Sequence, residues 1–438
     1  MTGSPAQLKV GPVLLADGVR KFNFWTFMYA SFICVGMLAG MNFLQSYVLT
    51  EHLHIPANEV GAVSGALAFW TEIVTILLIV PCGMISDRIG RRPVLVAGIL
   101  FLALGYALFP FASGIGELTL YRMVFAVGAA AVSALIATVG NDYTSNASRG
   151  RLFGFAGVMN GLGVIFMSVV IAAIPAALTA RGVAPVTAGI AMFLTAAGLC
   201  VMAAAIFSRG LKGGVPVTTM SPPPLSSLLT SGLRAAANPR IALSYGAAFT
   251  GRSDNAVKGI FVSLWVIQVA PLTGLSTSDA LAGAGRLMAI MGLVILLWTP
   301  LFGLILDRVN RVTGLAVAMG LAGLGYSSMG FVEEPLAARN LPLFALLAMG
   351  QGSAIIASVT LVGQEAPARE RGTIVATSGL FGAFGILIAA VVGGRLFDSI
   401  GPSAPFVMLG LFQLVLCLVA VVVRLKSPGG ATTARGSL

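Results

Sequence analysis

Residues 83–92 read GMISDRIGRR, and residues 303–311 read GLILDRVNR. Each stretch follows a long apolar segment and places a glycine four residues before an Asp-Arg pair. The two stretches lie 220 residues apart, about half of the 438-residue chain. An Arg-Gly pair at residues 149–150 recurs at residues 371–372, an offset of 222. Self-similarity at one spacing predicts a chain built from two duplicated halves.

The composition predicts a membrane protein with many spans. Hydrophobic residues make up 57% of the chain and charged residues only 9%, whereas soluble domains average about 45–50% and about 25%. A helix needs about 20 apolar residues to cross the hydrocarbon layer, and such segments recur twelve times. They are residues 24–50, 60–86, 93–116, 118–141, 152–180, 182–208, 241–270, 287–306 with a start near 280, 312–332, 340–364, 372–394 and 399–423.

The placement of lysine and arginine predicts the orientation in the membrane. Of the 26 such residues, 19 fall in segments on one side of the predicted spans, 3 on the other side, and 4 within spans. Cytoplasmic segments carry the excess of Lys and Arg, so we expect both termini in the cytoplasm and the chain in the cytoplasmic (inner) membrane. The net charge of +11 is then a topology signal, and no nucleic-acid partner is expected.

The longest polar interruption divides the chain. Residues 209–240 are rich in Gly, Pro and Ser and are predicted to form a cytoplasmic linker. On either side we expect an N-terminal six-helix bundle over residues 1–208 and a C-terminal six-helix bundle over residues 241–425. Residues 426–438 are predicted to be a disordered tail. The protein is expected to be a monomer in the lipid bilayer.

The loop motif resembles the signature of the major facilitator superfamily, G-x-x-x-D-R-x-G-R-[RK], which lies between spans two and three. Arg122 and Gly128 are similar to a weaker motif of that family, R-x-x-x-G-x-G, although Ala126 replaces the first glycine. The resemblance covers about residues 20–425. It implies an all-α membrane protein of twelve transmembrane helices in two pseudo-symmetric bundles, with a substrate site near the middle of the membrane and alternating access.

The loop motif also predicts a gate. Gly83 would permit a close helix approach, Asp87 could face the positive N-terminus of the eleventh span, and Arg91 could pair with Asp142. Such contacts would latch the inner side in one transport state and break in the other. The alternative is that these charges only anchor the loop. The gating candidates are Gly83, Asp87, Arg88, Arg91, Asp142, Asp307 and Arg308.

Charged residues within the spans predict the kind of ligand. They are Glu72, Arg122, Arg252, Asp254, Lys258 and Arg286. An intramembrane charge costs about 2.5–3.5 kcal/mol, so these side chains should face a wet interior and partner one another. Four cations against two carboxylates leave an excess of positive charge, which favours an anionic ligand. Arg286 lies near the predicted outer interface and could instead extend to the headgroups.

Three of these charges lie in one segment, residues 249–259, FTGRSDNAVKG. In a regular helix Asp254 and Lys258 are one turn apart, which predicts an ion pair. Arg252 then lies on another face with Tyr245 and Asn255. One regular helix cannot point all three charges into one cavity, and Gly, Ser and Asn are poor helix formers. The segment is therefore predicted to unwind locally, as at other transport sites.

We expect Arg252 and Arg122 to bind the anionic group of the substrate, because the planar guanidinium forms two parallel bonds to carboxylate or phosphate. The Asp254–Lys258 pair would keep the empty site neutral. In the alternative interpretation these charges only brace the helix. The substrate-binding candidates are Arg122, Tyr245, Arg252, Asn255, Asp254, Lys258, Asn160 and Gln351, the last two being equally suited to hold helices together.

The sequence thus predicts a secondary transporter of a small organic anion, coupled to protons through Glu72 or Asp254. Carboxylates within spans form proton relays in transporters, although Glu72 could equally make a static hydrogen bond. Proton-driven efflux of amphipathic compounds is one alternative, and a non-transporting assembly factor or receptor is another. No nucleotide-binding or hydrolase motif is present, so we expect neither an enzyme nor a cofactor or metal. The expected partners are the anionic substrate, protons and lipid.

Overall fold

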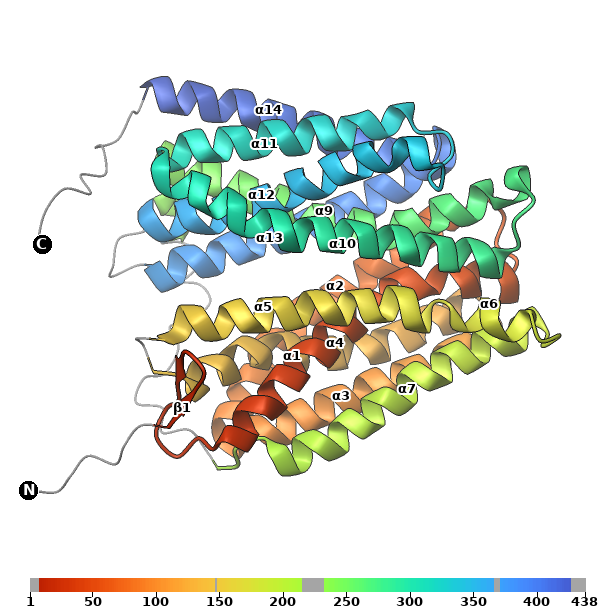
Figure 1. Ribbon diagram of the computed structural model, residues 1–438, viewed down its shortest axis with the longest axis horizontal. Coiled ribbons are helices and arrows are strands. Elements are labelled where there is room, and N and C mark those ends of the chain that lie inside the picture. Colours follow the sequence, from red (N-terminus) through yellow and green to blue (C-terminus); the bar gives the residue numbers. More distant parts are fainter. Residues whose placement is uncertain (1–7, 146–147, 215–231, 366–370, 427–438) are drawn as a thin grey trace, which may run out of the picture. The chain divides into compact units, whose positions relative to one another are not determined.

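The structure is a computed structural model that describes residues 8–145, 148–214, 232–365 and 371–426 (Figure 1). Within that part, twelve helices are long and apolar enough to cross a membrane, which confirms the predicted class. They cover Lys21–His52, Val60–Ile89, Arg91–Phe111, Ile115–Tyr143, Arg149–Thr179, Pro185–Gly210, Pro239–Thr273, Thr277–Arg308, Arg311–Phe331, Ala338–Val362, Thr373–Ser399 and Ala404–Lys426. The predicted tail beyond residue 426 and residues 215–231 of the predicted linker lie outside the described residues.

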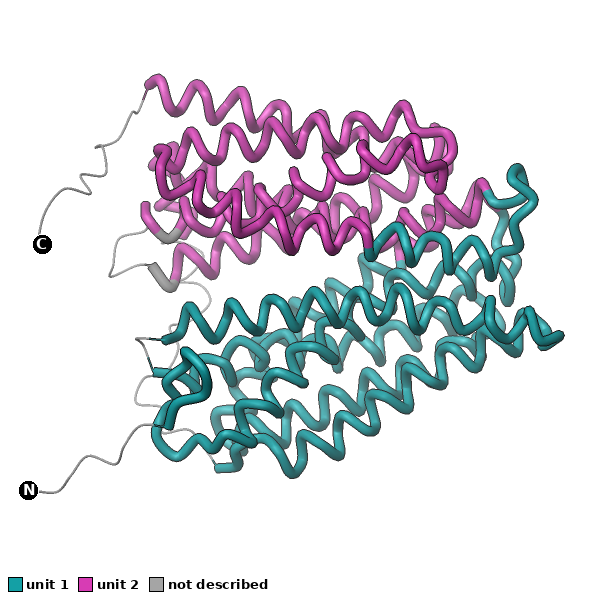
Figure 2. The backbone as a smooth tube through the Cα atoms, in the orientation of Figure 1, with its two compact units in different colours: residues 1–56, 67–220, 270–289 teal, residues 57–66, 221–269, 290–438 magenta. Residues whose placement is uncertain are grey.

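The chain forms two compact units (Figure 2). Unit 1 comprises residues 1–56, 67–220 and 270–289. In unit 1, α3 packs on α4 and α7, and α1 packs on α5. Its helices are α1 (Lys21–Tyr47), η1 (Val48–His52), most of α2 (Val60–Ile89), α3 (Arg91–Leu108), η2 (Phe109–Phe111), α4 (Ile115–Tyr143), α5 (Arg149–Phe166), η4 (Met167–Ile171), α6 (Ile174–Thr179), α7 (Pro185–Gly210), η5 (Ala270–Thr273) and the start of α10 (Thr277–Arg308).

Unit 2 comprises residues 57–66, 221–269 and 290–438. Its α9 packs on α12, α13 and α14, and α11 packs on α12 and α14, around a core of buried Leu, Ala, Met and Phe side chains. Its helices are the start of α2, α9 (Pro239–Val269), the rest of α10, α11 (Arg311–Ser327), η6 (Ser328–Phe331), η7 (Ala338–Asn340), α12 (Leu341–Glu365), α13 (Arg371–Ser399) and α14 (Ala404–Lys426).

The units differ from the predicted halves at two places, because α2 and α10 each begin in one unit and continue in the other. Glycines make the close contacts there. A Cβ atom built on Gly65 of α2 would lie 2.3 Å from the carbonyl oxygen of Ala390 in α13. A Cβ on Gly285 of α10 would lie 1.7 Å from the carbonyl oxygen of Ser168 in η4. These positions are 220 and 222 residues apart, so the two contacts are related by the internal repeat. We call them the α2–α13 seam and the α10–η4 seam.

A carboxylate strengthens the α2–α13 seam. Asp398, near the end of α13, accepts hydrogen bonds from the backbone nitrogens of Gly61 (2.8 Å) and Ala62 (2.7 Å) in the first turn of α2. The first N–H groups of a helix lack partners within the helix and carry partial positive charge. Asp398 therefore satisfies two of them with a favourable charge.

A short hairpin precedes the first span. Strands β1 (Lys9–Val10) and β2 (Val13–Leu14) pair in antiparallel register, and Gly11 supplies the positive φ of +55° at the turn. Leu14 donates its backbone N–H to the hydroxyl of Ser148 at 2.9 Å, and Arg151 donates to the carbonyl oxygen of Pro12 at 3.0 Å. The hairpin thus attaches the start of the chain to the α4–α5 connection.

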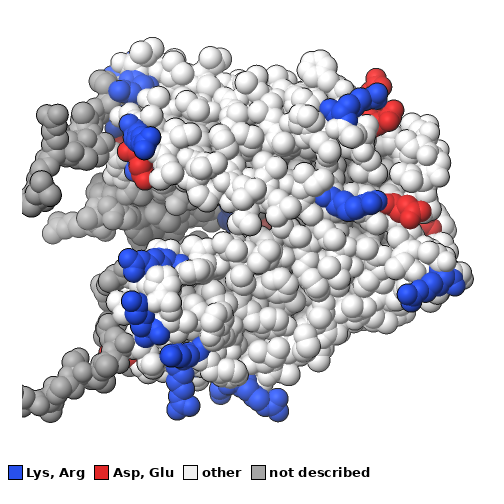
Figure 3. All heavy atoms as spheres, viewed as in Figure 1, with Lys and Arg blue, Asp and Glu red and all other residues white. Residues whose placement is uncertain are grey.

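Charged side chains lie mainly toward the helix ends. On the face shown in Figure 3 the helix flanks are almost free of Lys, Arg, Asp and Glu, and the coloured side chains gather at the two ends. This distribution suits helices whose flanks contact lipid, since polar groups are satisfied only beyond the hydrocarbon layer.

Candidate functional site

Helix α9 carries the charged segment without a break. It is helical from Pro239 to Val269, so the predicted unwinding of residues 251–255 is wrong. The polar side chains bond to their own helix: the hydroxyl of Ser253 donates to the carbonyl oxygen of Phe249 at 2.7 Å, and the amide of Asn255 donates to that of Gly251 at 3.4 Å. Poor helix formers are therefore accommodated by bonds one turn back and by packing against α12, α13 and α14.

Arg252 and Asn255 both lie on the exposed side of α9. The aliphatic part of Arg252 rests against Gly382 of α13, where a Cβ atom would come within 2.2 Å of its Cδ. Its Nη1 donates to the carbonyl oxygen of Gly379 at 3.4 Å, which is long for a hydrogen bond to a guanidinium. Most of the donor capacity of Arg252 is thus unused within the described residues.

The sequence predicted that Tyr245 and Arg252 share one face of the site, but Tyr245 is buried. Its side chain is 2% exposed, its hydroxyl donates to the carbonyl oxygen of Gly232 at 3.0 Å, and its ring stacks on Phe381 with the centroids 5.0 Å apart. Spacing along α9 predicts a shared face, but it does not show that α13 covers that face at Tyr245. In this structure Tyr245 is a packing residue.

The predicted ion pair between Asp254 and Lys258 is also absent. Asp254 is fully buried, and both of its carboxylate oxygens accept from Nε2 of Gln413 in α14, at 2.7 and 2.8 Å. Lys258 donates to Oε1 of Gln351 in α12 at 2.7 Å. The amide of Gln351 then donates to Oδ1 of Asn255 at 3.0 Å. Asp254 and Lys258 are therefore each held by a glutamine from another helix.

Gln413 is a site residue that the sequence analysis missed. It lies in the middle of an apolar span, and its side chain is fully buried. Its Oε1 has no hydrogen-bond partner among the described residues. The signal was a single uncharged polar residue in the last span, a pattern that occurs equally at ordinary helix contacts.

Arg122 forms the second polar centre, inside unit 1. It is 1% exposed and projects from α4, where its guanidinium lies 5.2 Å from the ring centroid of Phe125. Its Nε donates to the hydroxyl of Thr71 in α2 at 2.9 Å, and its Nη2 donates to the side-chain oxygen of Asn42 in α1. Nη1 is buried and has no partner among the described residues. Arg122 thus joins three helices and keeps one donor unused.

Other polar residues of unit 1 differ in how they are satisfied. Gln45 is fully buried, and neither atom of its amide has a partner within the described part of the chain. Glu72 is partly buried and follows Thr71. Asn160, with its amide oriented to satisfy both atoms, donates to the carbonyl oxygens of Ser31 (3.0 Å) and Ala156 (3.1 Å). Asn160 therefore fastens α5 to α1.

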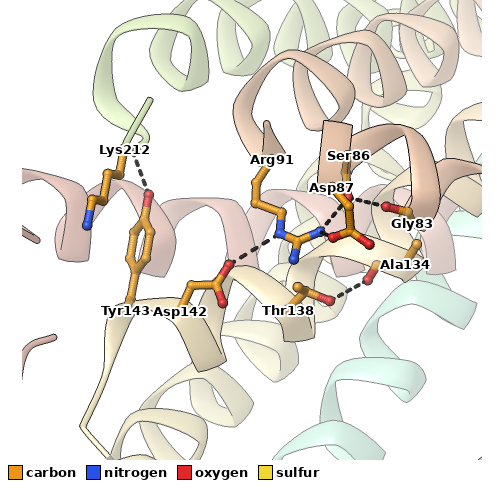
Figure 4. Close-up of polar contacts among 9 residues, drawn as sticks. All are labelled: Gly83, Ser86, Asp87, Arg91, Ala134, Thr138, Asp142, Tyr143 and Lys212. Carbon is orange, nitrogen blue, oxygen red and sulfur yellow. Dashed lines mark hydrogen bonds and ion pairs between the residues drawn. The ribbon is translucent and has the colours of Figure 1, made fainter. Parts of the chain in front are cut away.

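The loop motif forms a charged cluster at the end of α2 (Figure 4). Arg91 pairs with Asp142 of α4, Nε to Oδ2, at 3.3 Å, as the sequence predicted. It also pairs with Asp87 and donates to the hydroxyl of Ser86 at 2.6 Å. The predicted close approach at Gly83 is absent, because a Cβ atom there would meet nothing within 4 Å.

The repeated motif is simpler. Arg311 pairs with Asp307 at 3.1 Å, and a Cβ atom on Gly303 would again meet nothing within 4 Å. Arg88, Arg308 and Arg286 are exposed. Whether these residues gate transport stays a prediction, as do the substrate-binding roles on α9 and α4.

Comparison with known proteins identifies the family. The sequence matches the Major Facilitator Superfamily over residues 26–338 and 275–437, and the chain therefore belongs to this superfamily. It is 29% identical over 430 residues to magnetosome protein MamH of Paramagnetospirillum magneticum (strain ATCC 700264 / AMB-1), which covers 95% of this chain and 96% of MamH. It is 34% identical over 122 residues to the class B tetracycline resistance protein of Escherichia coli, 28% of each chain.

A solved structure shows the same fold. The crystal structure of the nucleoside transporter NupG superimposes with a TM-score of 0.70 at 14% identity, covering 92% of this chain and 99% of NupG. Together with the family match, this identifies a multi-pass transporter of the superfamily and not an enzyme.

Proposed function

We propose that this chain is a secondary active transporter that moves a small organic anion, bearing a carboxylate or phosphate, across the cytoplasmic membrane by alternating access. The observation that carries the proposal is Arg252, an exposed guanidinium on a membrane-spanning helix with one long hydrogen bond of 3.4 Å.

Exposure of Arg252 to lipid would be costly. A charge in the hydrocarbon layer costs about 2.5–3.5 kcal/mol, so its exposed side is expected to meet water or an anion. The guanidinium can form two parallel hydrogen bonds to one carboxylate or phosphate group. Lys258, six residues further along the same continuous helix, lies on another face and is held by Gln351. The anionic group is therefore assigned to Arg252.

Unit 1 supports the same kind of ligand. The unused Nη1 of Arg122 and the amide of Gln45 are buried polar groups without partners among the described residues. Leaving such a group unsatisfied costs about 1–3 kcal/mol, and more when it is charged. A polar solute, or water that the solute displaces, would supply the missing hydrogen bonds.

We further propose that transport is coupled to protons through Asp254, with Glu72 as the second candidate. Asp254 lies one turn from Lys258, yet its carboxylate has a neutral partner. A proton on Asp254 would therefore change the charge of the site without breaking an ion pair. The excess of Lys and Arg on one side supports cytoplasmic termini, and we propose a monomer as the working unit.

Ligand-dependent unfolding tests the substrate class. We would screen simple carboxylates and phosphate esters against the purified protein by thermal shift, because a ligand at about 100 times its Kd stabilises the folded state by about 2.7 kcal/mol. At least one anion should raise the Tm of the wild type, and Arg252→Ala should abolish that rise. Arg286→Ala removes the same charge from another exposed position and should retain it. If no anion raises the Tm, the proposal fails.

Efflux of amphipathic compounds is a second candidate, favoured by the local similarity to a tetracycline resistance protein over 122 residues. Proteoliposomes distinguish the two functions. An anion carrier should take up the stabilising anion, and this uptake should require Arg252. An efflux carrier should instead export an amphipathic dye, driven by protons that move down their gradient in the opposite direction. A non-transporting assembly factor would move neither.

A further inference from the structure

The partner of Asp254 has an arrangement that the proposed function does not explain. Gln413 directs Nε2 at both carboxylate oxygens, 2.7 and 2.8 Å away. Its Oε1 is buried and has no partner among the described residues. Both residues are fully buried, so the arrangement has a saturated donor end and an unused acceptor end. An unpaired buried acceptor costs free energy. This cost would be removed in a second state in which Oε1 of Gln413 accepts a hydrogen bond.

A carboxylic acid would use it. The protonated side chain of Asp254 has an O–H donor and a carbonyl acceptor, and a primary amide has the matching acceptor and donor. Rotation about the terminal bonds of the two side chains would direct the O–H to Oε1 of Gln413, while Nε2 keeps one hydrogen bond to the other oxygen. The proton comes from water and adds to one carboxylate oxygen; no other covalent bond of the protein forms or breaks, and one N–H···O hydrogen bond is exchanged for one O–H···O hydrogen bond.

We propose that Gln413 is the positioning residue of the Asp254 proton site, with hydrogen bonds for both the charged and the neutral carboxyl. This inference rests on the proposed coupling of transport to protons. Gln413 donates twice to the carboxylate, and it donates once and accepts once with the acid. The charged state leaves only Oε1 of Gln413 unpaired, protonation of Asp254 pairs it, and the carboxyl of Asp254 has hydrogen bonds in both states.

The surrounding charges agree with this role. Lys258 on α9 is bound to Gln351 and makes no ion pair with Asp254, so a proton on Asp254 breaks no ion pair. Tyr326 of α11 donates to the backbone oxygen of Asp254 at 3.3 Å, which fixes the helix and not the carboxyl. From α12 and α14 the two glutamines face this part of α9, and the charged residues of α13 are confined to its ends.

Infrared difference spectroscopy of the full chain in vesicles, recorded between acidic and alkaline buffer, tests the inference. The wild type should show a carboxylic-acid C=O stretching band that Asp254→Asn removes. In Gln413→Met, which keeps the length of the side chain and removes both polar atoms, this band should move to higher frequency because its hydrogen bonds are lost. Gln268→Met removes another amide of α9, 14 residues from Asp254, and should leave the band in place.

A band with the wild-type frequency in Gln413→Met would overturn the role of Gln413 and leave Asp254 as the proton carrier. The absence of any band that depends on Asp254 would overturn the proton carrier itself, and this inference with it. If Gln413→Met does not fold, Gln413→Asn serves instead. It keeps the amide but shortens its reach by one methylene, and it should shift the same band.

Discussion

The two glycine seams predict a tryptophan substitution that opens one transport state. At Gly285 even a Cβ atom would lie 1.7 Å from the carbonyl oxygen of Ser168, whereas close carbon–oxygen contacts measure about 3.3 Å or more. The backbones would have to separate by about 1.6 Å for a methyl group, and further for an indole ring. Overpacking of this kind costs about 1–3 kcal/mol. If the seam exists in only one transport state, that cost shifts the equilibrium between states by about 5–150-fold.

A thiol in the other seam reports the shift. Ser64 of α2 is fully buried in unit 2, and Ser64→Cys changes one atom. With the partly buried Cys82 and Cys417 replaced by serine, we would measure the rate at which N-ethylmaleimide alkylates this cysteine. Gly285→Trp should raise the rate by one to two orders of magnitude, in line with the population shift. A substitution in the α10–η4 seam can raise the alkylation rate in the α2–α13 seam only if the two seams open together.

The matched control lies on the same helix. A Cβ atom at Gly303 of α10 would meet nothing within 4 Å, so Gly303→Trp should label at the rate of the parent protein. Thermal unfolding must first show that both variants are folded. Equal labelling rates in Gly285→Trp and Gly303→Trp would then refute the reasoning. The glycines of the seams would then be packing residues that do not differ between transport states.

Three further outcomes are expected from thermal unfolding in detergent. Gly163→Leu should destabilise unit 1 by about 1–3 kcal/mol or prevent folding, since a Cβ there would lie 1.9 Å from a carbonyl oxygen of α1, while Gly161→Leu, with open space around it, should be near neutral. Asp398→Ala should cost about 0.5–2 kcal/mol, because two N–H groups of α2 lose their cap. Asp142→Asn should cost less than about 1 kcal/mol, and high salt should reduce the difference, because the pair with Arg91 is partly exposed.

The spans could be predicted from the sequence because each needs only a long apolar run, a property of consecutive residues. The start of α10 at Thr277, close to the predicted 280, follows from the same rule. The hairpin at Lys9–Leu14 could not be predicted in this way, since its stability comes from Ser148 and Arg151, which are far away in sequence. The crossing of α2 and α10 between units likewise depends on contacts between distant segments.

The candidate site was predictable only in part, for a related reason. A charge in an apolar run is visible without any structure, and so Arg122, Arg252, Asp254 and Lys258 could be singled out. Their partners could not, because hydrogen bonds between helices depend on rotations that spacing within one helix does not fix. The pair of Arg91 with Asp142 is the exception, and there the loop motif supplied the missing information about the neighbouring span.

The two seams also show how duplicated halves can diverge without losing their backbone contacts. In the α2–α13 seam Asp398 caps the helix start with a full negative charge. Near the α10–η4 seam the corresponding polar contact is neutral: the hydroxyl of Tyr47 in α1 lies 2.9 Å from that of Ser278 at the start of α10. A charged cap gains more from a helix N-terminus than a neutral hydroxyl pair can, but it leaves a carboxylate to solvate when the seam parts. The α2–α13 seam is therefore the stronger of the two when closed.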